Sequence, residues 1–293
     1  MKFLKHGMLL TTLALTSAAW TCSIDGKEGF LPENDMYIPA NVKTTGGITE
    51  AEFNRVIDKA EAIYRPIIES HGARLEVTRN WEDGTVNAYA QQIGKTWRVA
   101  MFGGLARHNT ITSDGFALVL CHEIGHHIGG APRKGNFWGG TSWASNEGQA
   151  DYFANLKCLR RVWQDEDNAA VVAKMEVPEA VSKACGEQWT WNHDYNICIR
   201  GTMAGYSVSR LFHDGTGRNL PDVTTPDPRV VTTTNHNHPD YQCRLDTYFQ
   251  GSLCNVDYTQ DVSSTDEFVG TCNIASGDTV GNRPHCWFKP SAQ

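Results

Sequence analysis

The chain has 293 residues, 40% of them hydrophobic, and a formal net charge of −7. This length is enough for one large domain or two small ones with a sizeable core, and the mean hydropathy of −0.41 is typical of a soluble globular chain. Lys and Arg are scattered through the sequence. That pattern argues against a nucleic-acid partner, because nucleic acids are bound through clustered positive charge.

The first 19 residues have the pattern of a signal peptide. Lys2 and Lys5 form a basic start, an apolar run follows over residues 8–15, and small residues precede Trp20. We therefore expect an exported protein, either periplasmic or secreted. A lipid anchor at Cys22, which would attach the protein to the envelope, is an alternative. No later apolar run approaches about 18 residues, so we expect no transmembrane span in the mature chain.

The chain has nine cysteines. Without Cys22 the number is eight, and because an exported chain is oxidised, we expect up to four disulfides, with the pairing left open. Cys121 is expected to pack or pair behind its helix, with a reactive thiol as the alternative. The other seven are Cys158, Cys185, Cys198, Cys243, Cys254, Cys272 and Cys286.

The first expected elements precede the chemistry-bearing part of the chain. Residues 20–48 are expected to form a linker or a wrapping arm. An amphipathic helix should follow from Thr49 to about Ser70, because Thr49 and Glu52 form a capping box; Pro66 should kink it or end its first part. Short strands are expected over residues 74–81, 86–92 and 96–102.

Two predicted helices carry polar residues in an informative pattern. The first spans residues 113–128, with Thr112 or Ser113 as its cap and the pair Gly129-Gly130 after its end. The second spans residues 145–163, with Ser145 as its expected cap. Further helical segments are expected over residues 167–184, 204–212 and 239–249.

The first of these helices contains the pattern H-E-x-x-H, formed by His122, Glu123 and His126. Two residues four apart on a helix differ by only about 40° around its axis, so both imidazoles can reach one metal ion. The glutamate lies beside them and can act as general base on a metal-bound water. The pattern predicts one catalytic zinc ion.

A catalytic zinc usually has three protein ligands and one open position. Glu147, near the start of the second helix, is the expected third ligand. Asp151 follows on the same helix face and is expected to accept the free N–H of a ligand histidine. The alternative is that both carboxylates lie on a solvated helix face.

The sequence from Glu147 to Asp151 has the pattern E-x-x-A-D. Together with H-E-x-x-H it resembles the gluzincin metallopeptidases, and within them the HtpX and CAAX-prenyl-peptidase family. The resemblance covers roughly residues 49 to 250 and implies a zincin-type domain. It departs from that family in having no transmembrane helices, so a soluble, exported relative is expected.

Two further motifs extend the resemblance. His238 and Arg244 match the family's H-P-x-x-x-x-R motif, which implies that they face the zinc site and stabilise the oxyanion of the reaction intermediate. His236 is the main rival of His238 for this role. The segment Asn87-Ala88-Tyr89 matches an edge strand that pairs with the extended substrate, so these three residues are candidate substrate contacts.

These observations predict an α+β fold in which a small mixed sheet packs on the zinc-binding helices. The expected function is a zinc-dependent endopeptidase acting on protein or peptide substrates. The alternative is a non-enzymatic, zinc-stabilised exported binding or chaperone protein on a peptidase scaffold. The expected plan is a signal peptide over 1–19, an arm over 20–48, a zinc metallopeptidase domain over 49–252 and a Cys-containing tail over 253–293.

Overall fold

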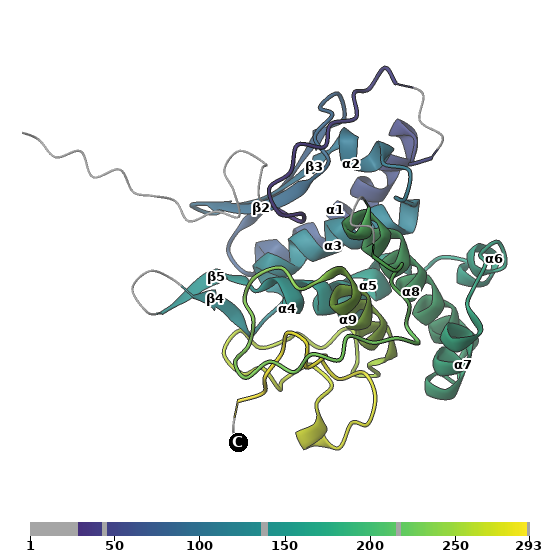
Figure 1. Ribbon diagram of the computed structural model, residues 1–293. Helices are drawn as coiled ribbons and strands as arrows, with labels where there is room; N and C mark the ends of the chain where they lie inside the picture. The colour runs from purple at the N-terminus through teal and green to yellow at the C-terminus, as the bar shows by residue number, and fades with distance from the viewer. Residues whose placement is uncertain (1–28, 43–45, 136–139, 215–217, 292–293) are drawn as a thin grey trace, which may run out of the picture.

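A computed structural model describes residues 29–42, 46–135, 140–214 and 218–291, and its fold is a mixed α+β arrangement, as expected. The predicted signal peptide and Cys22 lie outside the described residues. Figure 1 shows the larger sheet and α1 (Glu50–Ser70) above α3 (Ser113–Ile128), with further helices and the C-terminal tail below it. In the described part of the chain, no helix combines the length and apolar character that crossing a bilayer requires.

The larger sheet has three strands in the order β1-β3-β2. β1 (Arg74–Asn80) runs parallel to β3 (Thr96–Phe102), and β2 (Ala88–Ile93) runs antiparallel to it. All three strands were predicted, although β2 begins two residues later than expected. β2 is an edge strand, and just before it the amide of Val86 donates to Met36 of the N-terminal segment.

Helix α1 begins as the sequence predicts. The side chain of Thr49 accepts from the amide of Glu52, and the Glu52 carboxylate accepts from the amide of Thr49 at 2.9 Å. The expectation that Pro66 would end its first part was wrong, since the helix continues to Ser70. Pro66 lies on the exposed side of α1, where water can satisfy the carbonyl left without a donor, while Tyr64 and Ile68 remain buried in the core.

Helix α3 runs through the centre of the molecule. It has the predicted bounds, Thr112 as its cap and Gly129 at its end. Nearly all of its side chains are buried, because the sheet and α1 pack on one side and other helices on the other. A helix buried all round is rigid, and it therefore fixes any group that it carries.

The second predicted helix is continuous over three segments: α4 (Glu147–Phe153), a π-helical turn (Ala154–Cys158) and α5 (Leu159–Trp163). Its predicted cap was wrong. Asn146, not Ser145, caps it, with its side-chain oxygen accepting from the amide of Gln149 at 2.8 Å. Ser145 is instead the last residue of strand β5, where its hydroxyl donates to Gly130.

Of the remaining elements, α2 lies beside the larger sheet, whereas α7 and α9 lie below α3 (Figure 1). Two of the predicted helices are longer than expected, α8 and α9. They pack against each other over much of their length, and α8 also packs on α3. The bounds are α2 (Gly103–Arg107), β4 (Arg133–Gly135), β5 (Thr141–Ser145), α6 (Asn168–Val172), α7 (Glu179–Gln188), α8 (Asn192–His213), α9 (Tyr241–Leu253) and a short 3-10 turn (Ile274–Ser276).

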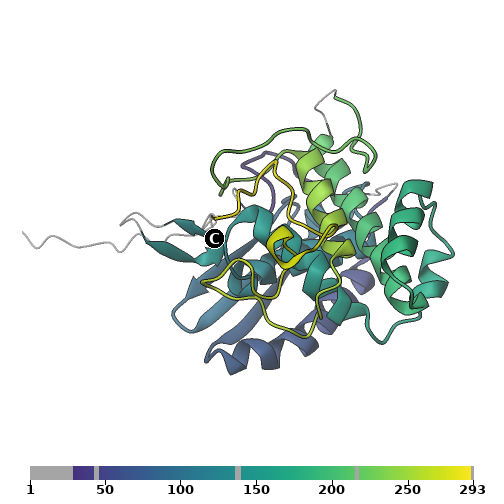
Figure 2. The ribbon, with the colours of Figure 1, turned by 90° about the horizontal axis from the view of Figure 1, so that it is seen from below.

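Four disulfides confirm the expectation from the cysteine count. Cys121 of α3 pairs with Cys158 behind the helix, so its thiol is not free. Cys185 pairs with Cys198, joining α7 to α8. The tail is tied to α9 by the last two disulfides, and Figure 2 shows it crossing the lower face of the molecule. They are Cys243–Cys286 and Cys254–Cys272.

The tail also supports α4 from outside. The indole of Trp287 is fully buried, donates to Thr247 of α9 at 3.0 Å and lies directly against Gly148. A Cβ atom at position 148 would fall inside van der Waals distance of the indole ring. The helix that carries Glu147 is therefore held at a distance that only glycine at 148 allows.

We predict that Gly148→Ala lowers the free energy of unfolding by about 1–3 kcal/mol through overpacking. Gly186→Ala is the matched control. It lies in helix α7, and a Cβ there has Tyr195 as its nearest neighbour at 3.7 Å, so this change should be neutral or stabilising. Denaturant unfolding measures both. An equal effect of the two substitutions would contradict the contact with Trp287.

Candidate metal centre

Helix α3 brings His122, Glu123 and His126 together in a fully buried site. The three side chains place one nitrogen or oxygen each within 4.8 Å of one another. The two imidazole rings lie 4.6 Å apart at an interplanar angle of 87°. A buried group of nitrogen and carboxylate ligands is the type of site that holds a divalent cation such as zinc.

Glu147 of α4 faces the two histidines. Its Oε2 lies 3.3 Å from His122 Nε2, and its Oε1 lies 3.8 Å from His126 Nε2. Tetrahedral ligands at normal zinc distances are about 3.3–3.6 Å apart. The first separation fits this value, and the second is slightly longer. The corresponding distance from His126 Nε2 to Glu123 Oε2 is 4.0 Å, so Glu147 fits the third position better than Glu123.

Both carboxyl oxygens of Glu123 and three further buried atoms of this group have no hydrogen-bond partner among the described residues; the three are His122 Nε2, His126 Nε2 and Glu147 Oε2. Leaving buried polar atoms unpaired is costly in free energy. A cation between them would satisfy all three at once. The residues present therefore fit the metal that the sequence predicts.

The other ring nitrogen of each histidine has a partner that fixes the ring. His122 Nδ1 lies 2.7 Å from Asp151 Oδ1, and His126 Nδ1 lies 2.9 Å from the carbonyl oxygen of Ser145. Both partner oxygens can accept a hydrogen bond from an Nδ1–H group, which leaves the Nε2 lone pair of each ring free for a metal. Asp151 thus lies where the sequence predicts it.

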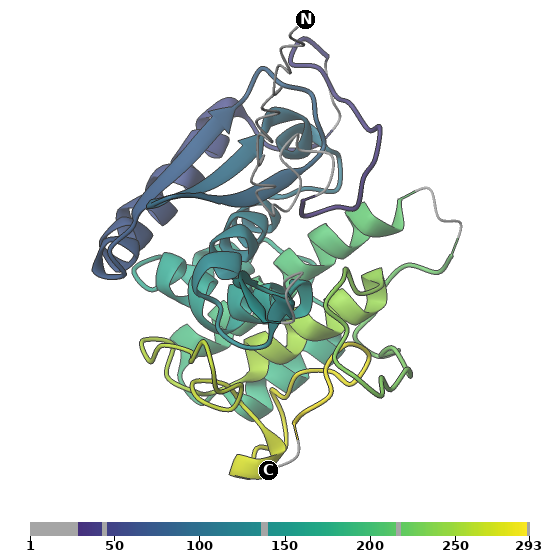
Figure 3. The same ribbon diagram turned by 90° about the vertical axis from the view of Figure 1, so that its left-hand side faces the viewer.

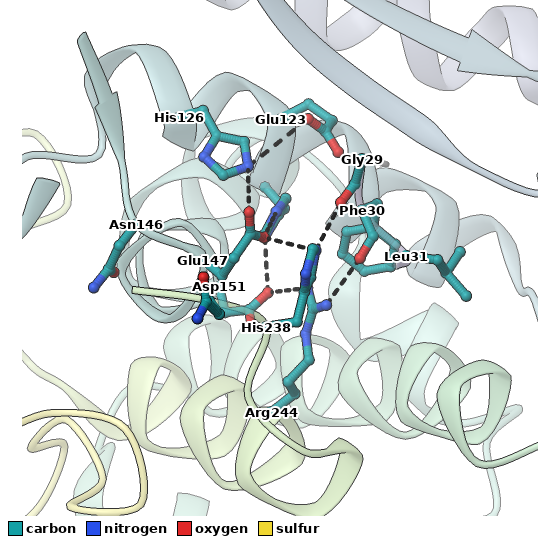
Figure 4. A network of polar contacts seen from close by, with 12 residues as sticks. Gly29, Phe30, Leu31, Glu123, His126, Asn146, Glu147, Asp151, His238 and Arg244 are labelled. Atoms are coloured by element: carbon teal, nitrogen blue, oxygen red, sulfur yellow. Dashed lines mark hydrogen bonds and ion pairs between the residues drawn. The ribbon is translucent and has the colours of Figure 1, made fainter. Parts of the chain in front are cut away.

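His238 and Arg244 also reach this region, as Figure 4 shows. His238 Nε2 lies 3.4 Å from Glu147 Oε2. The fully buried Arg244 guanidinium donates to Asp151 Oδ1 at 2.6 Å. His236, the rival of His238, lies farther out and contacts Asn146 instead. Of the two histidines, the structure therefore brings His238 to the ligand group.

The two glutamates of the site differ in the direction in which their surroundings shift the pKa. Burial raises the pKa of Glu123 to about 7, although His122 opposes this effect. Burial would also raise the pKa of Glu147, but His238, Lys134 and His126 together hold it well below its usual range. Glu147 is therefore held as an anion, which suits a metal ligand, whereas the carboxyl group of Glu123 has a raised pKa.

Sequence reasoning missed two residues of the site. Lys134 of β4 donates to Glu147 Oε1 at 2.7 Å, and nothing in its local sequence indicates this contact. The hydroxyl of Tyr248 donates to Asp151 Oδ1 at 2.7 Å. Tyr248 follows Arg244 by one helical turn on α9, so the i, i+4 spacing could have identified it.

The three candidate substrate contacts divide into two kinds. Asn87 and Ala88 bind the backbone of Phe30 and Leu31, which belong to the N-terminal segment: Phe30 N donates to Ala88 O at 2.8 Å, and Leu31 N donates to Asn87 Oδ1 at 2.9 Å. Tyr89 instead packs against Phe102. The first two thus contact the backbone of a segment that bends over residues 29–31.

His127 has a different position from its neighbour His126. Its ring is stacked between Trp97 and Trp143, at centroid distances of 5.3 and 5.0 Å. Its Nε2 lies 3.2 Å from the carbonyl oxygen of Arg98. His127 therefore belongs to the packing of α3 on the sheet, as its angular position on the helix predicts.

Comparisons with protein-family models, with curated proteins and with solved structures found no match for this chain.

We predict that Asp151→Asn weakens zinc binding by about 10–100-fold, because it removes the charged acceptor that orients His122. Asp114→Asn is a matched control. Asp114 lies at the start of α3, the helix that carries His122, and forms a largely buried ion pair with Arg200 at 2.7 Å. Both variants should lose about 3 kcal/mol of stability. Competition with a chromogenic chelator measures the affinity; equal affinities in both variants would contradict the role of Asp151.

Proposed function

We propose that the protein is a zinc-dependent endopeptidase. One observation carries the proposal: the unpaired, buried atoms of His122, His126 and Glu147 converge beside Glu123, whose carboxyl oxygens are also unpaired and which is not needed as a third ligand. A structural zinc site is closed and has no use for a general base. The combination favours a hydrolytic site.

When bound, zinc lowers the pKa of a water molecule and polarises a carbonyl group. Glu123 takes a proton from the attacking water and delivers it to the amine nitrogen that leaves. The Nε2–H group of His238 donates to the carbonyl oxygen on which negative charge develops. Asn87 and Ala88 hold the peptide backbone on the amine side of the bond, so the carbonyl carbon stays within reach of the water.

The cellular setting is part of the same proposal. Four disulfides are typical of proteins that fold in an oxidising compartment. Together with the N-terminal sequence pattern, they favour an exported peptidase related to the gluzincins.

We predict that Glu123→Gln retains one zinc per chain and loses peptidase activity by about 10²–10⁴-fold, because the general base is removed while the ligands stay. His122→Ala should lose the zinc as well. His127→Gln is the matched control, because its ring faces β3 and not the ligand group; it should keep the zinc. Elemental analysis and hydrolysis of casein test all three variants beside the unaltered chain.

Three results would contradict the proposal in different ways. Full activity in Glu123→Gln would exclude Glu123 as the base. Unchanged zinc in His122→Ala would exclude the ligand assignment. One zinc in the unaltered chain, without hydrolysis even after the N-terminal segment has been displaced, would favour the alternative of a zinc-stabilised binding or chaperone protein.

A further inference from the structure

The N-terminal segment occupies the cleft beside the metal centre. Gly29, Phe30 and Leu31 are all buried, and Figure 3 shows the purple segment descending beside the sheet and turning inward towards α8. Its next part follows the same edge: Tyr37 forms an antiparallel bridge with Thr85, and Ile38 N donates to Gly84 O at 2.7 Å. The segment therefore runs antiparallel to the chain that leads into β2.

The polar backbone groups of three consecutive residues have partners in the cleft. The Gly29 carbonyl oxygen lies 2.7 Å from His238 Nε2, and the Phe30 carbonyl accepts from Arg244 Nη1 at 2.9 Å (Figure 4). The side chain of Asn87 binds both the amide and the carbonyl of Leu31, at 2.9 and 3.2 Å. These partners recognise backbone groups, although the segment is bent here: the Gly29 amide donates to the Leu31 carbonyl oxygen at 3.1 Å. A bound peptide could use the same partners, because none of these contacts depends on the identity of a side chain of the segment.

The position of the Gly29 carbonyl group indicates the register of the bound segment, that is, which of its peptide bonds lies next to the proposed ligand group. This carbonyl group is held by His238, whose Nε2 is also 3.4 Å from the proposed ligand atom Glu147 Oε2. The carbonyl group next to the metal ligands is the one that a peptidase attacks. In this register, the bond between Gly29 and Phe30 takes the place of the bond to be cleaved. The bend closed by the Gly29 amide and the Leu31 carbonyl oxygen, 3.1 Å apart, holds this bond out of the extended conformation of a bound substrate, so the segment blocks the site without being cut.

The side chain of Phe30 fills an aromatic pocket. Its ring meets His122 edge-on with a centroid distance of 4.9 Å and Phe212 at 5.1 Å, and the Arg244 guanidinium carbon lies 4.4 Å from its centroid. The ring is completely buried. An aromatic ring gains most from such a site, because it buries a large apolar area and accepts a cation on its face.

We propose that Gly29–Leu31 is a tethered copy of the substrate: the site cleaves peptides that have a large aromatic residue directly after the cleaved bond, and the segment must leave before another peptide can bind. This inference depends on the proposed peptidase function and adds its substrate class and its regulation. Four residues that the sequence associates with substrate or oxyanion binding already hold this segment; they are Asn87, Ala88, His238 and Arg244.

Two variants of the full chain displace the segment in different ways. Phe30→Ala removes the side chain from the pocket. Gly29→Ala keeps Phe30, but its Cβ would fall inside van der Waals distance of the Ala88 carbonyl oxygen. Glu33→Ala is the matched control, because Glu33 is an exposed residue of the same segment. Thermal unfolding identifies any variant that does not fold.

The four zinc-loaded proteins are assayed with two quenched-fluorescence peptides that differ only in Gly-Phe-Leu against Gly-Ala-Leu. We expect Gly29→Ala and Phe30→Ala to cleave the Phe peptide at least about tenfold faster than the unaltered chain and Glu33→Ala, and to prefer Phe over Ala by at least about tenfold. Equal rates in all four proteins would overturn the inhibition. Faster variants without preference for Phe would overturn the substrate class.

Amide hydrogen exchange separates this inference from the proposed function, because it does not depend on activity. We expect slow exchange of the Phe30 and Leu31 amides in the unaltered chain and fast exchange in Gly29→Ala. Fast exchange in the unaltered chain would overturn the inference and leave the peptidase proposal standing. Slow exchange without cleavage by any of the four proteins would contradict the peptidase function, and the substrate class would fail with it.

Discussion

The site depends on one buried carboxylate. Oδ1 of Asp151 on α4 lies 2.7 Å from His122 on α3, and it accepts from Arg244 and Tyr248 on α9 at 2.6 and 2.7 Å. A single buried charge thus joins three helices. Because its partners would themselves be left uncompensated without it, this contact sets the geometry of the ligand group and the orientation of the chain that faces it.

The same network links the proposed metal centre to the N-terminal segment. Arg244 contacts Asp151 with one nitrogen and the Phe30 carbonyl with another, while the Phe30 ring touches His122, which Asp151 also holds. The segment that contains Phe30 therefore contacts the same groups that orient His122. The C-terminal tail supports this network indirectly, because Trp287 and two disulfides help to hold α4 and α9 together.

Local signals in the sequence predicted the elements that local interactions determine. The bounds of α3 follow from Thr112 and Gly129 at its ends, and the capping box at Thr49 starts α1. The ligand group follows from helical spacing, which is also local. The cap of α4 was predicted one residue too early, because Ser and Asn are equally good caps. Ser145 instead ends a strand of a hairpin, and the formation of that hairpin is a tertiary feature.

The arrangement of the N-terminal segment could not be predicted in this way. It was expected to be a linker or a wrapping arm, and its decisive contacts join residues 56 and 209 positions apart. They also involve backbone groups, which every sequence possesses. Similarly, Lys134 reaches Glu147 because the β4–β5 hairpin folds back towards α4. The spacing of the two residues in the sequence does not predict where that hairpin lies.

The most direct test of the account is X-ray absorption spectroscopy at the zinc edge of the metal-loaded full chain. We predict about two imidazole nitrogens and one carboxylate oxygen at about 2.0–2.2 Å, one further light-atom ligand and no sulfur. Zinc coordinated by sulfur, or a spectrum with fewer than two imidazoles, would contradict the assignment of His122, His126 and Glu147 as the metal ligands.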